Sequence, residues 1–186
     1  MKRVLPVILG AVALVSMYAF VSVTSKKAAV YTVSTDASKI EWKAANAGGP
    51  HSGTFPLKSG QLNVDGGKLT GGTFIIDLTN LKADADGLTT HLKTKDFFEV
   101  ETFAQATFEI TGVTYTSATA ADIAGKLTLK GVSAPVKFSS TITGADDKKF
   151  SATATFNIDR TLVGITWGPG RVNNDVAINV TLVAAK

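Results

Sequence analysis

KFSATATFNI, residues 149–158, decides the fold class, because its side chains alternate strictly between apolar and polar. A period of two is the signature of a β-strand with one buried face. The apolar face carries Phe150, Ala152, Ala154, Phe156 and Ile158. Large and small side chains are mixed on this face, whereas a packed sandwich core would more often carry Leu, Ile and Val throughout. The stretch therefore favours a β-barrel with free space inside.

The same alternation recurs through the rest of the chain. Further candidate strands lie at residues 39–45, 68–78, 106–114, 122–131, 135–142 and 175–184. Glycine-rich turn signals such as Asp65-Gly66-Gly67 separate them, and no helical pattern is long enough for a βαβ crossover. Several patterns run for about ten residues, longer than a usual strand. We predict an all-β fold, an extended antiparallel up-and-down barrel of about eight strands. Its outward positions are polar, which argues against a barrel in a membrane.

Residues 1–29 have a different character. Lys2 and Arg3 precede an uncharged apolar run at residues 4–23. This is the arrangement of a signal peptide, and about 20 apolar residues can also span a bilayer. We expect either a cleaved signal peptide or an anchor that contacts a membrane. Both place residues 30–186, the barrel domain, in the periplasm or another extracytoplasmic space.

Composition argues against several classes of function. The chain has no cysteine, two histidines and a formal net charge of +4. It can form no disulfide, no thiolate metal site and no cysteine nucleophile. The lysines are scattered instead of forming a basic run, so no nucleic-acid partner is expected. The histidine spacing does not suit a metal site, and there is no cofactor fingerprint. The oligomeric state is left open.

One connection is longer than the others and contains HLKTKDFFEV, residues 91–100. Asp86 is suited to cap a short helix over residues 87–93, which places Leu88 and Leu92 one turn apart. Asp96 and Glu99 have the spacing of a capping box for a second short turn. A connection of more than about twenty residues in a compact domain is uncommon and tends to be functional.

We predict that residues 91–103 form a lid over the open end of the barrel. A helix this short is marginal in water by itself, so the lid must be held by apolar contacts. Leu88, Leu92, Phe97 and Phe98 can supply them. Lys93 and Lys95 would keep the outer side of the lid in water.

A set of short motifs occurs in order along the chain. They are HSGTF (51–55), IDLTNL (76–81), HLKTKDFF (91–98), ATFEIT (106–111), GKLTLKG (125–131) and NIDR (157–160). Together they closely resemble the YceI-like family, over essentially all of residues 30–186. The resemblance implies a lipocalin-like barrel that encloses a long apolar channel. It also implies export and the binding of polyisoprenoid lipids, with no established enzymatic reaction.

An isoprenoid chain requires a dry tube, because burial of apolar surface supplies about 25 cal/mol per Å². The ring-bearing candidates for the tube wall are Trp42, Phe55, Phe74, Phe97, Phe98, Phe108, Phe138, Phe150 and Phe156. The alternative is that these rings simply fill a core.

Two polar residues are candidates for contact with a ligand. His51 cannot form a catalytic pair with its neighbour Ser52, because adjacent strand residues point to opposite faces. We expect His51 to hydrogen-bond within the barrel or to a ligand head group. Arg160 is expected to pair with a carboxylate, or to contact a phosphate or quinone head group through its guanidinium. The candidate carboxylates are Asp159, Asp77 and Asp175. His91 is expected to be exposed to solvent.

These observations favour an exported binding or carrier protein for a polyisoprenoid or similar long-chain amphiphilic lipid. One alternative is a packed structural or stress-related barrel without a ligand. Another is an isomerase or hydrolase that uses the barrel as a pocket. The sequence shows no nucleophile motif and no paired carboxylates at a recognisable spacing, so we expect no enzymatic activity and no cofactor.

Overall fold

The computed structural model describes residues 28–186, which form one antiparallel sheet closed on itself. Its strands are β1 (Ala29–Val33), β2 (Lys39–Asn46), β3 (Gly49–Thr54), β4 (Leu57–Asp65), β5 (Lys68–Asp77), β6 (Lys82–Ala83), β7 (Gln105–Tyr115), β8 (Ala120–Leu129), β9 (Val132–Ala145), β10 (Lys149–Asp159) and β11 (Asp175–Ala185). An α-helix, α1 (Asp86–Leu92), and a 3-10 turn, η1 (Arg160–Val163), complete the described chain. The predicted signal peptide or anchor falls outside the described residues, apart from its last two. Between residues 28 and 186, no helix has the length and apolar character needed to cross a membrane.

Eight of the strands make the barrel wall, in the order β1-β4-β5-β7-β8-β9-β10-β11. Pairing of Thr32 with Ala185 and of Val33 with Ala184 closes the ring between β1 and β11. Each strand pairs antiparallel to the next. The predicted antiparallel barrel of about eight strands is confirmed.

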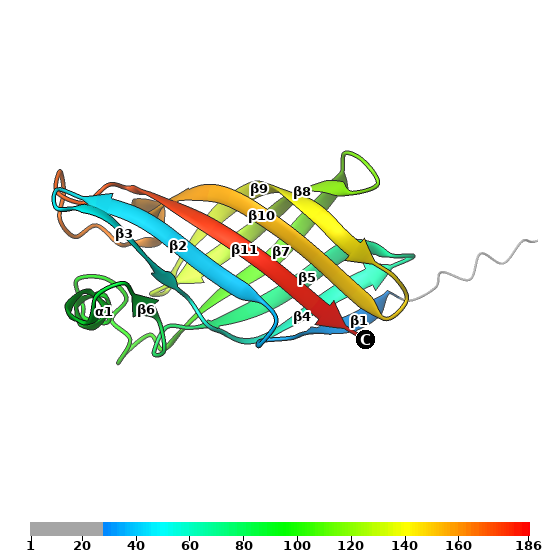
Figure 1. Cartoon of the computed structure of the whole chain (residues 1–186), viewed down its shortest axis with the longest axis horizontal. Coiled ribbons are helices and arrows are strands. Elements are labelled where there is room, and N and C mark those ends of the chain that lie inside the picture. Colours follow the sequence, from blue (N-terminus) through cyan, green and yellow to red (C-terminus); the bar gives the residue numbers. More distant parts are fainter. Residues whose placement is uncertain (1–27) are drawn as a thin grey trace, which may run out of the picture.

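The seam of the barrel opens toward one end. β11 pairs with β1 at residues 184–185 but with β2 at residues 177–181. β2 then pairs with β3, and β3 with β6, so these strands extend the sheet beyond the ring (Figure 1). At this end β6 is the last strand of the sheet.

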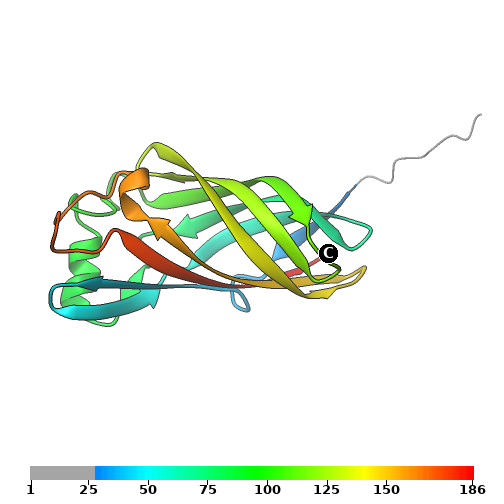
Figure 2. The ribbon, with the colours of Figure 1, turned by 90° about the horizontal axis from the view of Figure 1, so that it is seen from above.

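The predicted short helix lies at this same end. Figures 1 and 2 place α1 at the end opposite the start of β1 and the C-terminus. We call this the lid end and the other the closed end, and we call residues 84–104 the lid. Two hydrogen bonds tie the lid to its neighbours. Asp84 N–H donates to the Ser52 carbonyl of β3 (2.9 Å), and the Ala104 carbonyl accepts from Leu78 N–H, which directly follows β5 (3.0 Å).

The expected capping of the lid is wrong in detail. Asp86 is the first residue of α1, and the cap position is held by Ala85, which makes no side-chain hydrogen bond. Thr89 connects the helix to the segment before it. Its hydroxyl donates to the Ala85 carbonyl (3.1 Å) and accepts from Ala83 N–H (2.9 Å). Residues 95–98 do form turns, as expected, but the predicted capping box is absent, because Glu99 N–H donates to the Thr94 carbonyl (2.8 Å) and Asp96 N–H to Thr94 Oγ1 (3.4 Å).

The core consists of two buried clusters. Tyr31, Leu62, Phe150 and Ala184 belong to the cluster that packs the closed end, where none of them is more than 3% exposed. Trp42, Leu78, Phe97 and Phe98 belong to the cluster of the lid end. Since the second cluster includes the lid, access to the interior is expected from the lid end.

Candidate functional site

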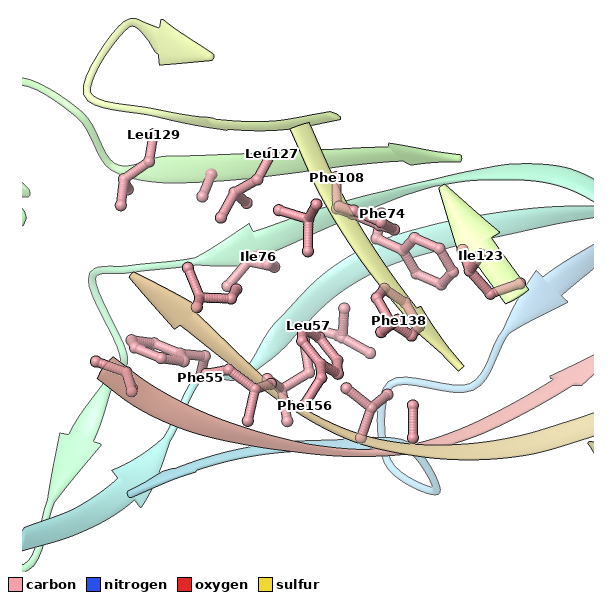
Figure 3. Close-up of a pocket in the computed structure, with 18 of the residues that line it drawn as sticks. Phe55, Leu57, Phe74, Ile76, Phe108, Ile123, Leu127, Leu129, Phe138 and Phe156 are labelled. Carbon is pink, nitrogen blue, oxygen red and sulfur yellow. The ribbon is translucent and has the colours of Figure 1, made fainter. Parts of the chain in front are cut away.

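A cavity of about 200 Å³, which we call the tube, lies inside the barrel. Its wall is almost wholly apolar, and the labelled side chains point into a common interior (Figure 3). Six of the predicted rings line it: Phe55, Phe74, Phe98, Phe108, Phe138 and Phe156. Only Ser140, Thr153 and Arg160 bring polar atoms to the lining.

Four of these rings form a continuous row across the barrel wall. The ring centroids of Phe74 and Phe108 lie 6.2 Å apart, and those of Phe108 and Phe138 lie 5.9 Å apart. Phe138 and Phe156 stack with their centroids at 4.1 Å. Gly125 makes room for this row, because a Cβ at that position would collide with the ring of Phe108. The rings at the apolar positions of the alternating strands thus form an aromatic lining.

A second cavity of about 180 Å³, which we call the vestibule, lies under the lid. Its lining includes the polar or ring-bearing side chains of Trp42, Asn46, His51, His91 and Trp167. It is therefore chemically distinct from the tube.

Two rings line both cavities, together with Arg160, Ile165 and Val176. Phe55 follows β3 and Phe98 belongs to the lid, and each borders the tube and the vestibule. Their centroids lie 5.5 Å apart in an edge-to-face contact. We call this pair the partition. Movement of the lid would displace Phe98 and join the two cavities.

Each histidine of the vestibule is paired with a carboxylate. His51 Nδ1 lies 3.0 Å from Asp84 Oδ1, and Asp84 Oδ2 accepts from Ser52 N–H at 3.0 Å. The hydrogen bond to His51 is the main cause that lowers the pKa of Asp84 below its ordinary value. The expectation that His51 hydrogen-bonds within the fold agrees with this pair.

His91 is more enclosed than expected. Its Nε2 lies 3.0 Å from Asp96 Oδ2, and its side chain is 35% exposed. Its ring meets those of Trp167 and Phe97 edge to face, at centroid distances of 4.7 and 5.1 Å. The expected exposure of His91 to solvent is therefore only partial, because one side of its ring packs against Trp167.

Arg160 is buried, and it forms no ion pair with any carboxylate of residues 28–186. Its Nε donates to the carbonyl of Asn173, Nη1 to those of Ile165 and Trp167, and Nη2 to that of Val172 and to Asn174 Oδ1, at 2.9–3.2 Å. The expected ion pair is wrong. A guanidinium has five N–H donors, and all five are used to hold the loop between η1 and β11, so none remains for a head group.

Trp42 lines the vestibule, and the residue is 5% exposed. The ring packs against Phe55 at 6.2 Å and over Gly53, where a Cβ would lie 2.7 Å from two of its atoms. Its Nε1–H is buried and has no acceptor among residues 28–186. Phe97 also lines the vestibule and not the tube.

Phe150 is the exception among the predicted rings. It is fully buried in the closed-end cluster and lines neither cavity. Conversely, the sequence did not single out the aliphatic wall residues Leu57, Ile76 and Leu127 or the vestibule residue Trp167. The strand alternation contained a signal for the aliphatic residues, since it places Leu127 on the inner face. The loop position of Trp167 had no such signal.

Comparison with known proteins adds independent findings. The sequence model of the YceI-like domain family matches residues 31–184. The UPF0312 protein of Pseudomonas fluorescens (strain SBW25) is 31% identical over 157 residues, which cover 79% of this chain and 80% of that protein.

Two solved structures share the fold. BcnA of Burkholderia cenocepacia superposes with a TM-score of 0.72 at 22% identity, over 81% of this chain and 98% of that chain. A polyisoprenoid binding domain from Saccharophagus degradans, implicated in plant cell wall breakdown, superposes with a TM-score of 0.69 at 15% identity, over 83% of this chain and 97% of that chain.

Proposed function

We propose that the barrel of this protein, which belongs to the YceI-like family, binds a polyisoprenoid or a similar long-chain amphiphilic lipid by its apolar chain. The observation that supports this proposal most strongly is the tube, an apolar cavity in the position that a packed barrel would fill with side chains. The polyisoprenoid binding domain with the same fold points to the same class of ligand.

The energetics of an apolar chain suit this tube. Burial contributes about 0.8 kcal/mol for each CH₂ group removed from water, so the chain needs no polar contact to bind. Small-molecule sites commonly have volumes of about 300–1,000 Å³, and the tube alone has about 200 Å³. With the vestibule, of about 180 Å³, it reaches this range. Long-chain binding therefore requires the partition to move.

Binding without catalysis is part of the proposal. The polar groups of the tube wall are a serine, a threonine and the fully occupied guanidinium of Arg160. None of these forms an acid–base pair with a nucleophile. Among residues 28–186, no three His, Cys, Asp or Glu side chains converge as metal ligands.

Export is also proposed, with or without removal of the N-terminal segment. Its support is the sequence, in which Lys2 and Arg3 precede an uncharged apolar run at residues 4–23. N-terminal sequencing of the protein from membrane and soluble fractions distinguishes the two forms. A start near residue 28–30 indicates a cleaved signal, and an intact Met1 in the membrane fraction indicates an anchor. An intact Met1 in the soluble cytoplasmic fraction contradicts export.

The ligand is identified by native mass spectrometry of protein purified from its own host, followed by extraction and analysis of the lipid. We expect a mass increment that disappears when the protein is denatured, and an extracted compound with a long apolar chain. Protein that carries no lipid, and that takes up none when mixed with the total lipid extract of the host, would contradict the proposal.

A further inference from the structure

The barrel wall contains an unpaired stretch between β9 and β10. The pairing of these two strands ends at Ser140 and Ala154. Within the described chain, residues 132–139 pair only with β8 and residues 155–159 only with β11, so the two strands part toward the lid end (Figure 2). We call these two facing segments the window. Along β10 the window is about 16 Å long.

The window lies against the tube. Val136 and Phe138 line the tube from β9, and Phe156 and Ile158 line it from β10. The rings of Phe138 and Phe156 point into the interior and stack, with their centroids 4.1 Å apart and an interplanar angle of 6° (Figure 3). Side chains, rather than strand pairing, therefore close the tube wall along the window.

The polar side chains of the window bond along their own half of the wall, and in residues 28–186 none bonds across it. Ser139 of β9 donates to Asp122 of β8 (2.7 Å). Thr155 of β10 donates to Asn179 of β11 (2.8 Å). Pro135, in the β9 segment, has no N–H to donate, and prolines within sheets are found mainly at edges and bulges. Each side of the window therefore has the character of a sheet edge.

The wall resists widening differently at the window and elsewhere. Separation of paired strands breaks ladder hydrogen bonds, and a buried N–H or C=O left without a partner is unfavourable. A gap between β5 and β7, beyond Gly72 and Ile110, is bridged, because Leu69 N–H donates to the Tyr115 hydroxyl (2.6 Å). At the window the strands lose only side-chain contacts, which a hydrocarbon chain between them replaces. The tube can therefore widen there without loss of strand pairing.

We propose that the window takes up the part of a lipid chain that the tube cannot hold, so that the protein binds chains longer than its closed interior. The inference rests on the proposed function, because the tube, of about 200 Å³, holds the first part of the same chain. Phe138 moves with β9 and Phe156 with β10, and the two rings unstack to pack on either side of the chain. Chain length, and not the head group, is the property that the window selects.

A reversible bridge across the window tests the inference. The chain has no cysteine, so Lys137→Cys together with Asn157→Cys introduces the only two thiols. Continuation of the register from Ser140 and Ala154 places these two exposed positions opposite each other. A short bis-methanethiosulfonate reagent links the thiols, and a reductant releases them. The probes are farnesol, with a short prenyl chain, and solanesol, with a long one. Their partitioning between the full chain and phosphatidylcholine vesicles is measured with the bridge and after its release.

We expect the bridge to weaken solanesol binding at least about tenfold and farnesol binding by less than about twofold, and its release to restore both. The matched control is Glu109→Cys with Lys126→Cys, on strands that pair at this position, where the same bridge should change neither probe. Solanesol binding that ignores the bridge across the window, or an equal loss of both probes, would overturn the inference and leave lipid binding intact. Failure of the unbridged protein to bind either probe would contradict the proposed function itself.

A distance measurement on the unbridged protein does not depend on the reagent. Spin labels on the same two cysteines report the width of the window by double electron–electron resonance. We expect solanesol to lengthen the distance between the labels by about 5 Å, comparable to one inter-strand spacing, and farnesol to leave it unchanged. An unchanged distance with solanesol bound would overturn the inference.

Discussion

Arg160 shows how a single side chain positions part of the site. The carbonyls that it binds belong to the loop carrying Ile165, Trp167 and Val172, all of which line the vestibule. Lysine cannot reproduce the planar fork of five donors. We therefore expect Arg160→Lys to lower the free energy of unfolding by about 3 kcal/mol, since several buried carbonyls lose their donor.

Urea denaturation, combined with lipid affinity at low urea, checks this expectation. The matched control is Arg171→Lys, because Arg171 is an exposed arginine of the same loop, and it should leave stability nearly unchanged. A variant at position 160 with wild-type stability but weakened lipid binding would instead make Arg160 a head-group ligand.

Asp77 illustrates a local source of acid sensitivity. Its carboxylate accepts from Thr79 N–H, the Thr79 hydroxyl and the Asn80 amide at 2.6–2.9 Å. The bond from the Thr79 side chain is the largest cause that lowers the pKa of Asp77 below its ordinary value. Because the folded pKa is depressed, this stabilisation is present above the unfolded value of about 3.9 and is lost as pH falls below it.

We expect Asp77→Asn to melt at a lower temperature than the wild type at pH 7, and the difference to shrink as the pH falls below about 4. Calorimetry between about pH 2.5 and pH 7 measures it. A difference that stays constant over this range would show that the Asp77 carboxylate does not contribute through its charge.

At the scale of the elements, we expect the lid to control access to the interior. Phe98 lines both cavities, whereas Phe97 lines only the vestibule. We expect Phe98→Ala to increase the rate of lipid release about tenfold or more, because it removes half of the partition. Phe97→Ala is the matched control for the loss of a buried ring, and each costs about 3 kcal/mol of stability or more.

Stopped-flow release of a fluorescent lipid into excess vesicles measures both rates. Equal acceleration by the two variants would mean that any loosening of the lid suffices and that the partition has no special role. The double substitution of Phe97 and Phe98 removes enough buried surface to threaten a domain of ordinary stability, so the single variants are the sharper test.

Lys130, in the turn between β8 and β9, connects the lid to the wall. Its Nζ donates to the Lys95 carbonyl at 3.1 Å and lies 3.6 Å from Glu99 Oε2. Lys130→Met should lower global stability by only about 1 kcal/mol or less, because the ion pair is long and its Glu99 side chain is exposed to solvent. It should nevertheless speed amide hydrogen exchange at Glu99 and Val100, since their bonds to Thr94 and Lys93 hold the lid turn.

Hydrogen exchange resolved by peptide checks the effect, with the closed-end strand β1 as the internal reference. Unchanged exchange in residues 94–103 would show that apolar contacts alone hold the lid. Faster exchange in β1 as well would show that the variant destabilises the whole barrel instead.

At the scale of the whole molecule, strand alternation was enough to predict an antiparallel barrel. It failed for β4, where a bulge between Leu57 and Ser59 shifts the phase, so that the buried positions are Leu57, Gly60, Leu62 and Val64. β1 was not predicted from the sequence, because only two of its five side chains are buried. A short or irregular strand gives too little periodicity to read.

The site was predictable only in part, for a related reason. The rings that line the tube follow from alternation, which is a local property. The partners of His51 and Arg160 do not: Asp84 lies 33 positions beyond His51, and Arg160 is held by carbonyls of an irregular loop. The vestibule therefore forms only when the lid, β2, β3 and that loop meet in the folded chain.

The central claim, that the barrel holds an apolar chain inside, is tested most directly by filling the tube. Ala154 lines the tube from β10. A phenylalanine at this position would place its ring in the tube, and an apolar cavity can accept a ring of this size. We compare the lipid-bound fraction of wild type and Ala154→Phe by native mass spectrometry after exposure to the same host lipid extract. We predict that the wild type carries lipid and that the variant, folded and with a wild-type melting temperature, carries none. A variant that is destabilised by about 1–3 kcal/mol, as expected for overpacking a filled core, and that binds lipid as the wild type does would contradict the claim.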